Sequence, residues 1–264
     1  MRLIFIFILL LDFNAAGAQV ESQNLNRELY KKNKVKSVKV YESWRKNGMP
    51  CKKENLISTE IYDTSGQLIE SFSELGFLLG IYHQQFRYDS TGKMTNNIGY
   101  YKEEPIITHY TYGYDQKNRV IKKACPGSCW YYTYDSLNNM VTSKWLLMGA
   151  AYPEEFFLDS FHYNSIGQKV KMTRYHDDGS LYFIVTHTYD DAGNKISETR
   201  FQHGQMTDTW SYQYDGNHHM ISFDHYGSQM EKTTYDMSSE YNTDGTVKSR
   251  ISDGHYLRFE YEFY

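Results

Sequence analysis

The sequence predicts an all-β fold, an antiparallel meander of about 18 strands arranged as tandem two-strand repeats. Three observations predict it. A short motif, Tyr followed by Asp or Asn, recurs eight times, and a second turn signal lies between most consecutive copies. The composition includes 26 Tyr, 14 Phe and 4 Trp, which favour strands, and only 4 Pro, which would interrupt a ladder. A sheet of this many strands twists too strongly to stay flat, so we expect it to curl.

The motif sets the period of the repeat. Its copies begin at Tyr62, Tyr88, Tyr114, Tyr134, Tyr163, Tyr189, Tyr214 and Tyr241. Subtracting neighbouring starts gives spacings of 26, 26, 20, 29, 26, 25 and 27 residues. Two turns in each period leave two strands of about 8 to 10 residues, whereas a β-propeller blade needs about 40 residues and four strands.

The residue types within the motif predict a hairpin turn. A type I turn favours Asp or Asn at its first corner and Gly at its fourth. The first corner is Asp63, Asp89, Asp115, Asp135, Asn164, Asp190, Asp215 or Asn242, and the fourth is Gly66, Gly92, Asn118, Asn138, Gly167, Gly193, His218 or Gly245. Gly, Asn and His tolerate positive φ, so each copy predicts a type I turn closed by a left-handed residue, which connects two antiparallel strands.

The strand before each turn predicts one aromatic face. Counting back by twos from the motif Tyr stays on one face of a strand. The position two before it holds Phe86, Tyr112, Tyr132, Phe161 and Tyr212 in five of the eight copies. The opposite face is polar, for example at Thr209, Ser211 and Gln213. We therefore expect an aromatic ladder that faces inward.

The N-terminal stretch predicts export. Residues 1–18 combine Arg2, an apolar run from Leu3 to Leu11 and a small-residue end, which is typical of a signal peptide cleaved before Gln19. This apolar run is about half the length that a membrane span requires, so the mature chain is expected to have no span and to be periplasmic, cell-surface or extracellular. Residues 19–40 form a lead-in, within which 24–32 could form a short amphipathic helix, and residues 41–264 form a single repeat domain.

Three successive segments follow one pattern: Tyr189-Asp190-Asp191-Ala192-Gly193-Asn194, then Gly204, then Tyr212-Gln213-Tyr214-Asp215. Together they resemble one full unit of the YD repeat, also called the RHS repeat. The resemblance covers about Tyr62 to Gly245. It implies a β-spiral, which in long bacterial members forms a hollow shell around a C-terminal toxin, with relatives in teneurins. The chain departs from that pattern in having few repeats, no toxin domain before Tyr264 and no counterpart of the self-cleaving segment.

No motif for catalysis, cofactor binding or metal binding appears, so we expect a protein that is not an enzyme and needs no cofactor. The carboxylates Glu154, Glu155 and Asp159 resemble a glycosidase pair only in residue type, and a solvated loop explains them better. His219 and His225 lie near the turn residue His218, but neighbours on a strand point to opposite faces, which disfavours a shared metal ion.

Cysteine chemistry depends on the compartment. In an oxidising compartment Cys125 and Cys129, which flank a turn, are candidates for a disulfide, with reduced thiols as the alternative. Cys51 has no evident partner.

Together these features predict a non-enzymatic, exported scaffold that presents a binding surface to an unknown protein or a cell-surface polymer. The alternative is a carbohydrate-binding protein of the envelope, because Trp44 and Trp145 lie outside the aromatic stripe and could stack on sugars. A remnant of a toxin-enclosing RHS shell and a glycan-active enzyme are less favoured. The net charge of −4 argues against a nucleic-acid partner.

Overall fold

The computed structural model describes residues 27–46, 49–50, 53–75, 80–101, 104–147, 156–227, 237–252 and 255–264. These residues form one short helix, 27–32, and twenty strands, so the predicted all-β class is confirmed. The strands are β1 (Val35–Lys46), β2 (Met49–Pro50), β3 (Asn55–Tyr62), β4 (Leu68–Leu75), β5 (Gly80–Tyr88), β6 (Met94–Tyr101), β7 (Glu104–His109), β8 (Thr111–Tyr114), β9 (Val120–Cys125), β10 (Ser128–Tyr134), β11 (Met140–Leu147), β12 (Phe156–Tyr163), β13 (Lys169–Tyr175), β14 (Leu181–Tyr189), β15 (Lys195–Gln202), β16 (Gln205–Tyr214), β17 (Met220–Gly227), β18 (Met237–Tyr241), β19 (Val247–Ser252) and β20 (His255–Phe263). The expected signal peptide lies outside the described residues.

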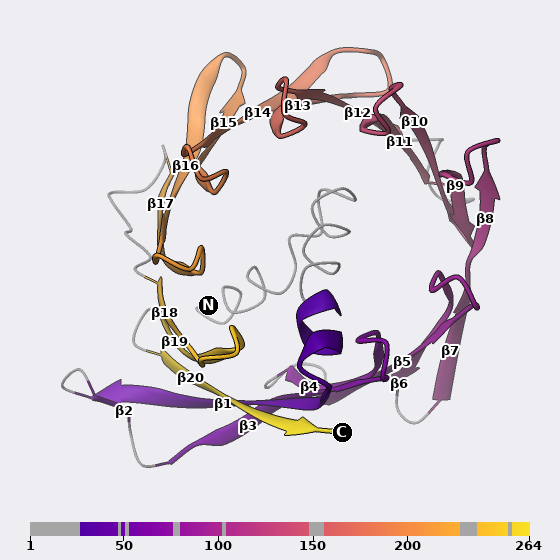
Figure 1. Cartoon of the computed structure of the whole chain (residues 1–264). Coiled ribbons are helices and arrows are strands. Elements are labelled where there is room, and N and C mark those ends of the chain that lie inside the picture. The colour runs from indigo at the N-terminus through magenta and orange to yellow at the C-terminus, as the bar shows by residue number, and fades with distance from the viewer. Residues whose placement is uncertain are drawn as a thin grey trace.

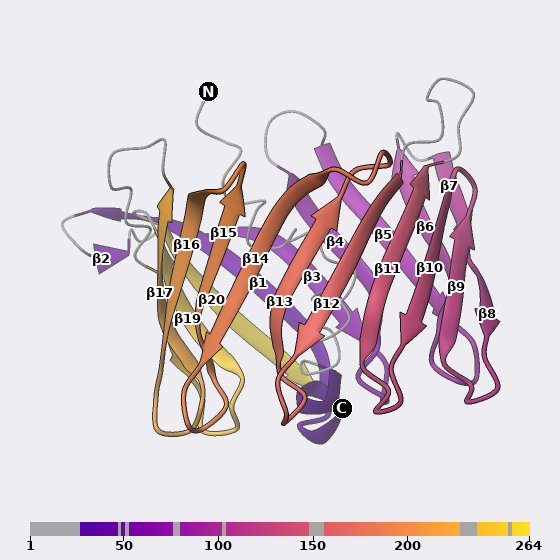
Figure 2. The ribbon, with the colours of Figure 1, turned by 90° about the horizontal axis from the view of Figure 1, so that it is seen from above.

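The strands form a ring (Figure 1). From β3 onward consecutive strands pair antiparallel, except that β7 and β8 are successive parts of one run interrupted at Tyr110. Strand β1 closes the ring, because one of its edges pairs with β3 and the other with β20. The sheet therefore begins at Val35, inside the stretch expected as a lead-in. Seen from above, the strands run steeply between two rims (Figure 2).

Each Tyr-Asp motif forms the same turn. The φ angle is positive at all eight fourth corners, from 59° at Asn118 to 88° at Gly193. The fourth-corner N–H donates to the first-corner carbonyl at 2.9 to 3.3 Å in every copy. At Asp63, Oδ1 also accepts from the N–H groups of Ser65 and Gln67, at 2.8 and 3.0 Å. Side chain and backbone thus hold the turn together, as its residue types require.

A register shift accompanies these turns. Tyr62 pairs with Leu68, but the next residue back, Ile61, pairs with Glu70, so a bulge follows the turn. The same shift occurs at the other motif tyrosines, for example between Thr188 and Tyr189. A bulge changes which residues share a face, so the alternation counted before a turn cannot be carried through it.

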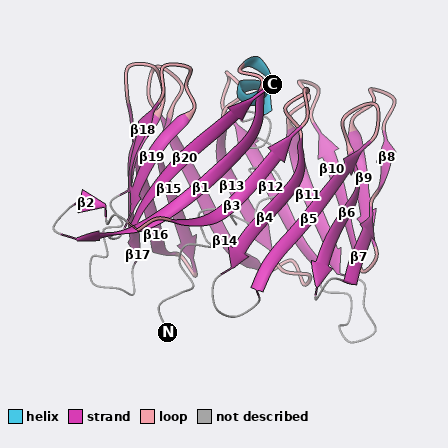
Figure 3. Cartoon of the chain, turned by 90° about the horizontal axis from the view of Figure 1, so that it is seen from below, coloured by secondary structure: helices cyan, strands magenta, loops and turns pink. Residues whose placement is uncertain are grey.

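The helix lies inside the ring of strands in Figure 1 and at one rim of the ring in Figure 3, and its contact with motif residue Tyr62 shows which face of the sheet is the inner one. The ring of Tyr30 on the helix lies 4.7 Å from that of Tyr62 and 6.4 Å from that of Tyr261. Buried Val35 and Val38 pack in the same cluster. We call the face that carries the motif tyrosines the inner wall.

In the described residues no helix is both long and apolar enough to cross a membrane.

Tyrosine hydroxyls connect successive repeats along the inner wall. Each donates to the carbonyl of the residue six positions after a motif Tyr, at 2.7 to 2.9 Å. The donor and acceptor pairs are Tyr88 and Leu68, Tyr112 and Met94, Tyr134 and Val120, Tyr163 and Met140, Tyr189 and Lys169, Tyr214 and Lys195, Tyr241 and Met220, and Tyr261 and Val247. Six of the eight donors are motif tyrosines. The recurring Tyr therefore packs on the inner wall and also donates a hydrogen bond to a backbone carbonyl of the neighbouring hairpin.

Replacing Tyr189 by phenylalanine should therefore lower the free energy of unfolding by about 1 kcal/mol, because the Lys169 carbonyl loses its donor while the ring remains. Urea unfolding at constant m-value measures the change. Tyr226→Phe is the control, since Tyr226 is exposed. Equal effects of the two substitutions would contradict a role for the hydroxyl.

Candidate binding surface on the inner wall

An aromatic row crosses the inner wall between β10 and β14. Trp130 pairs with Trp145, and Trp145 with Phe157, so cross-strand register places their side chains on one face. Their ring centroids lie 6.5 and 6.1 Å apart, and Tyr182 continues the row 5.8 Å from Phe157. The placement of Trp145 outside the aromatic stripe is therefore wrong. It follows a turn and its bulge, so counting back from the motif tyrosines does not reach it.

Beside the aromatic row lies a buried ion pair. Arg174 donates from Nε to Asp159 Oδ1 at 2.7 Å and from Nη2 to Oδ2 at 2.8 Å. The side chains are only 12% and 8% exposed, and the guanidinium lies over Phe157 and Phe183. Asp159 was expected in a solvated loop, but it stands on β12 facing inward. The other two candidate carboxylates, Glu154 and Glu155, lie outside the described residues.

A second polar group continues the surface on β15 to β17. Asp208 lies opposite Arg200 in the register but pairs with His225, with Oδ1 3.0 Å from Nε2. His225 stacks on Trp210, with centroids 4.7 Å apart and planes at 6°. The Arg200 guanidinium stands 4.1 Å above the ring of Phe183. Charged groups on this wall are thus held against aromatic rings.

Three nitrogens of the inner wall are buried without a hydrogen-bond partner: Trp145 Nε1, Arg200 Nε and His187 Nδ1. Folded proteins pair the great majority of buried polar groups, because an unpaired one costs about 1 to 3 kcal/mol. Trp145 Nε1 and Arg200 Nε can only donate. These two donors therefore have no acceptor among the described residues, and an acceptor brought by a ligand would satisfy them.

Because His187 is buried, the free energy of unfolding of the protein depends on pH. The pKa of His187 is lowered from 6.5 to about 4, chiefly by desolvation and also by the charges of Lys195 and Lys169, while the charge of Glu198 opposes the shift. The unfolded chain takes up a proton near pH 6.5 and the folded chain only near pH 4, so this stability is present above pH 6.5 and lost as pH falls.

We expect the free energy of unfolding to fall by about 2 kcal/mol through His187 alone between pH 7 and pH 5. Urea unfolding of the parent chain and of His187→Gln at both values isolates this contribution. An identical pH dependence in the two chains would show that His187 stays accessible to protons.

The other polar candidates from the sequence have local roles. His218 is a turn residue with φ of 65°, and Nδ1 of His219 lies 3.2 Å from Asp215 Oδ2. With His225 bound to Asp208, these histidines do not converge, and no group of three metal-ligand side chains occurs within the described residues.

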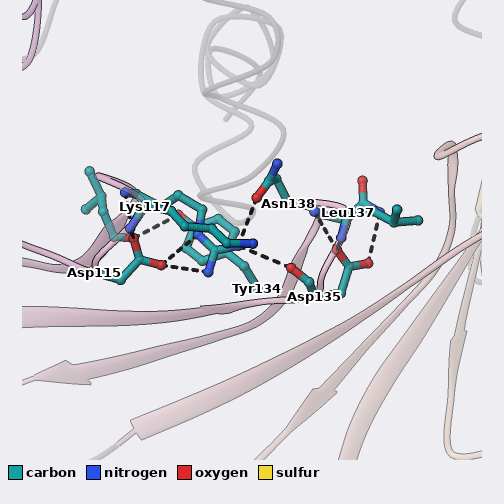
Figure 4. Close-up of polar contacts among 9 residues, drawn as sticks. Asp115, Lys117, Tyr134, Asp135, Leu137 and Asn138 are labelled. Atoms are coloured by element: carbon teal, nitrogen blue, oxygen red, sulfur yellow. Dashed lines mark hydrogen bonds and ion pairs between the residues drawn. The ribbon is translucent and has the colours of Figure 1, made fainter.

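The turns also contain a contact that residue types alone did not indicate. Arg119 donates to Asp115 Oδ2 in its own turn at 2.7 Å. It also donates to the Asp135 carbonyl and to Asn138 Oδ1 in the next turn, both at 3.1 Å (Figure 4). Arg119 therefore links two neighbouring turns across the shortest spacing in the repeat.

Cys125 and Cys129, the candidates for a disulfide, are both free thiols in this structure. The turn between them has two residues, so Cys125 pairs with Ser128 and Cys129 with Ala124. Successive residues on a strand point to opposite faces, which places the two thiols on opposite sides of the wall. Cys51 lies outside the described residues.

Comparison with known proteins finds matches among solved structures. No protein-family model matches the chain, and no curated protein matches it. Among solved structures, TcdB2-TccC3-Cdc42 matches with 12% identity and a TM-score of 0.41, over 81% of this chain and 12% of that one. A porin-like protein from Bacteroides uniformis matches with 11% identity and a TM-score of 0.47, over 87% of this chain and 97% of that one. This chain thus spans about an eighth of the TcdB2-TccC3-Cdc42 chain.

Proposed function

We infer that this protein is a non-enzymatic, exported repeat scaffold whose inner wall binds another protein or a cell-surface polymer. The observation that carries the inference is the set of buried, unpaired donors at Trp145 and Arg200 within an aromatic surface. Donors left unpaired in a folded chain favour a ligand that supplies acceptors.

The described charged groups of the inner wall support binding rather than catalysis. A general acid or base needs a carboxyl or imidazole that can reach a substrate. Asp159 is taken up by two bonds from Arg174, and Asp208 by His225. Proton transfer by these carboxylates would first require breaking a contact that holds the wall together.

Site-specific crosslinking tests where the ligand binds. A photo-crosslinking p-benzoylphenylalanine is placed at Tyr182 on the inner wall or at Tyr131, which is exposed on the outer face. Irradiation of the protein in the exporting cell should give a defined adduct from position 182 and none from position 131. Adducts from position 131 alone would move the binding surface to the outer face.

The affinity for the same ligand should fall when Trp145 is replaced by phenylalanine. This change keeps an aromatic ring between Trp130 and Phe157 but removes the unpaired donor. Affinity should fall about tenfold, the loss expected for one hydrogen bond, while the free energy of unfolding changes little. Unchanged affinity, measured by isothermal titration, would exclude Trp145 from the contact.

A carbohydrate at a separate surface is the second candidate, and Trp44 supports it. Its side chain is exposed, with 62% of its surface accessible, and its ring lies 4.2 Å from that of His255. His255 Nδ1 lies 2.8 Å from Glu42 Oε1, so polar groups flank an exposed aromatic face. A glycan array hit that Trp44→Ala abolishes and Trp145→Phe leaves intact would favour this candidate.

Export is tested independently of the ligand. If residues 1–18 act as a signal peptide, N-terminal sequencing of the secreted protein should begin at Gln19. A chain recovered from the cytosol with Met1 in place would contradict export. Cleavage before Gln19 would leave the helix at 27–32 in the mature chain.

A further inference from the structure

Among the described side chains of the inner wall from β9 to β16, cations outnumber carboxylates. Register places five basic side chains on it, Lys123, Lys169, Arg174, Lys195 and Arg200, because each pairs across strands with an inner-wall residue or is itself bonded to one. Three carboxylates share this face: Asp159, Glu198 and Asp208. The whole chain has a net charge of −4, so this excess is local.

All three carboxylates already have partners. Asp159 binds Arg174, Glu198 Oε2 lies 2.7 Å from Lys195 Nζ, and Asp208 pairs with His225. Among the described residues, no carboxylate therefore remains for the other three cations.

Lys123, Lys169 and Arg200 rest on aromatic rings instead. Lys123 Nζ lies 4.6 Å from the ring centre of Tyr110 and 5.5 Å from that of Trp130. Lys169 Nζ lies 5.6 Å from the centre of Phe161, and the Arg200 guanidinium 4.1 Å from that of Phe183. A ring face positions a cation but does not neutralise it. The three positive charges therefore have no carboxylate partner among the described residues, and an anionic ligand would neutralise them.

The unpaired polar groups favour an acceptor-rich ligand. Trp145 Nε1 and Arg200 Nε are donors without acceptors. A peptide strand brings backbone donors as well as acceptors, and the backbone edges of the strands in this region pair with one another. An acidic sugar polymer brings carboxylate, hydroxyl and ring oxygens, which accept from all these groups.

We propose that the inner wall between β9 and β16 binds an acidic polysaccharide, with Lys123, Lys169 and Arg200 contacting its anionic groups and Trp145 a neutral oxygen. This assignment rests on the binding role inferred above for the inner wall and adds the chemical class of the ligand. The cations stand on three different strands, so the matching ligand is elongated rather than a single sugar.

The probe is polygalacturonate, compared with the same polymer after methyl esterification of its carboxylates and with poly-glutamate. We expect the secreted protein to bind polygalacturonate, with affinity that falls steeply as salt is raised, and to bind the ester at least tenfold more weakly. Equal binding of the ester would overturn the role of charge. Preference for poly-glutamate would assign the surface to an acidic protein segment instead.

Matched variants locate the contact. Arg200→Gln and Lys123→Met should each lower the affinity for polygalacturonate about tenfold, as expected for loss of a charge-assisted bond. Lys171→Gln is the control, because Lys171 lies on β13 on the opposite face and should change the affinity less than about twofold. An equal loss in the control would indicate non-specific attraction. An inner-wall crosslink at position 182 without binding to polygalacturonate would leave the proposed function standing and overturn the ligand class.

Discussion

Replacing Gly66 by alanine is expected to lower the free energy of unfolding by about 3 kcal/mol, more than the same change at any other motif glycine. Two costs combine at this position. Its φ of 76° disfavours a side chain, which accounts for about 1 kcal/mol. A Cβ there would also overlap the carbonyl oxygen of Arg27 and lie 2.9 Å from the Lys31 nitrogen. Neither atom can rotate away, so the helix at 27–32 must leave the turn.

Gly179→Ala is the matched control. Gly179 has a φ of 80° in a similar turn, and a Cβ there would meet nothing within 4 Å. Its cost should therefore be about 1 kcal/mol, the backbone contribution alone. Urea unfolding gives both values, and faster hydrogen exchange near the helix in Gly66→Ala would identify the helix as the element displaced. Equal costs at the two positions would mean that the helix contact contributes nothing.

The contrast between Gly66 and Gly179 shows which features could be predicted from sequence. The turn depends on the residues within it, since Asp63 accepts from Ser65 and Gln67 while Gly66 supplies the positive φ. Residue types alone therefore indicate it. The helix that covers Gly66 depends on where a separate segment docks. No local pattern specifies that position.

The inner wall could be predicted in part for a similar reason. Alternation before each turn correctly groups Phe161 with the other aromatic side chains, but the bulge after each turn shifts the alternation on the following strand. Trp145 and Arg174 both follow such a bulge, so their inward orientation requires the observed register. Closure of the ring by β1 and β20 joins segments more than 200 residues apart, as in the contact between Ser37 and Glu262. Sequence periodicity carries no information about such pairs.

Removing the guanidinium from the buried ion pair, in Arg174→Met, is expected to destabilise the protein by about 3 to 5 kcal/mol. Asp159, which is 6% exposed, would lose its two bonds of 2.7 and 2.8 Å from the guanidinium. A buried charge without its partner keeps its full desolvation cost. The neighbouring rings of Phe157 and Phe183 offer no donor that could replace the guanidinium.

Two controls separate the charge effect from packing. The double variant Asp159→Leu with Arg174→Met removes both charges and should recover most of the loss, because a well-packed apolar pair can replace a buried ion pair. Lys36→Met breaks the exposed pair with Glu262, whose side chains are 45% and 58% accessible, and should cost less than about 1 kcal/mol. Chemical unfolding of the parent chain, the single variants Asp159→Leu and Arg174→Met, and the double variant yields the coupling energy between Asp159 and Arg174. If the double variant is no more stable than Arg174→Met, the loss arises from the stacking of Arg174 between Phe157 and Phe183, and the cation rather than the ion pair holds this part of the inner wall together.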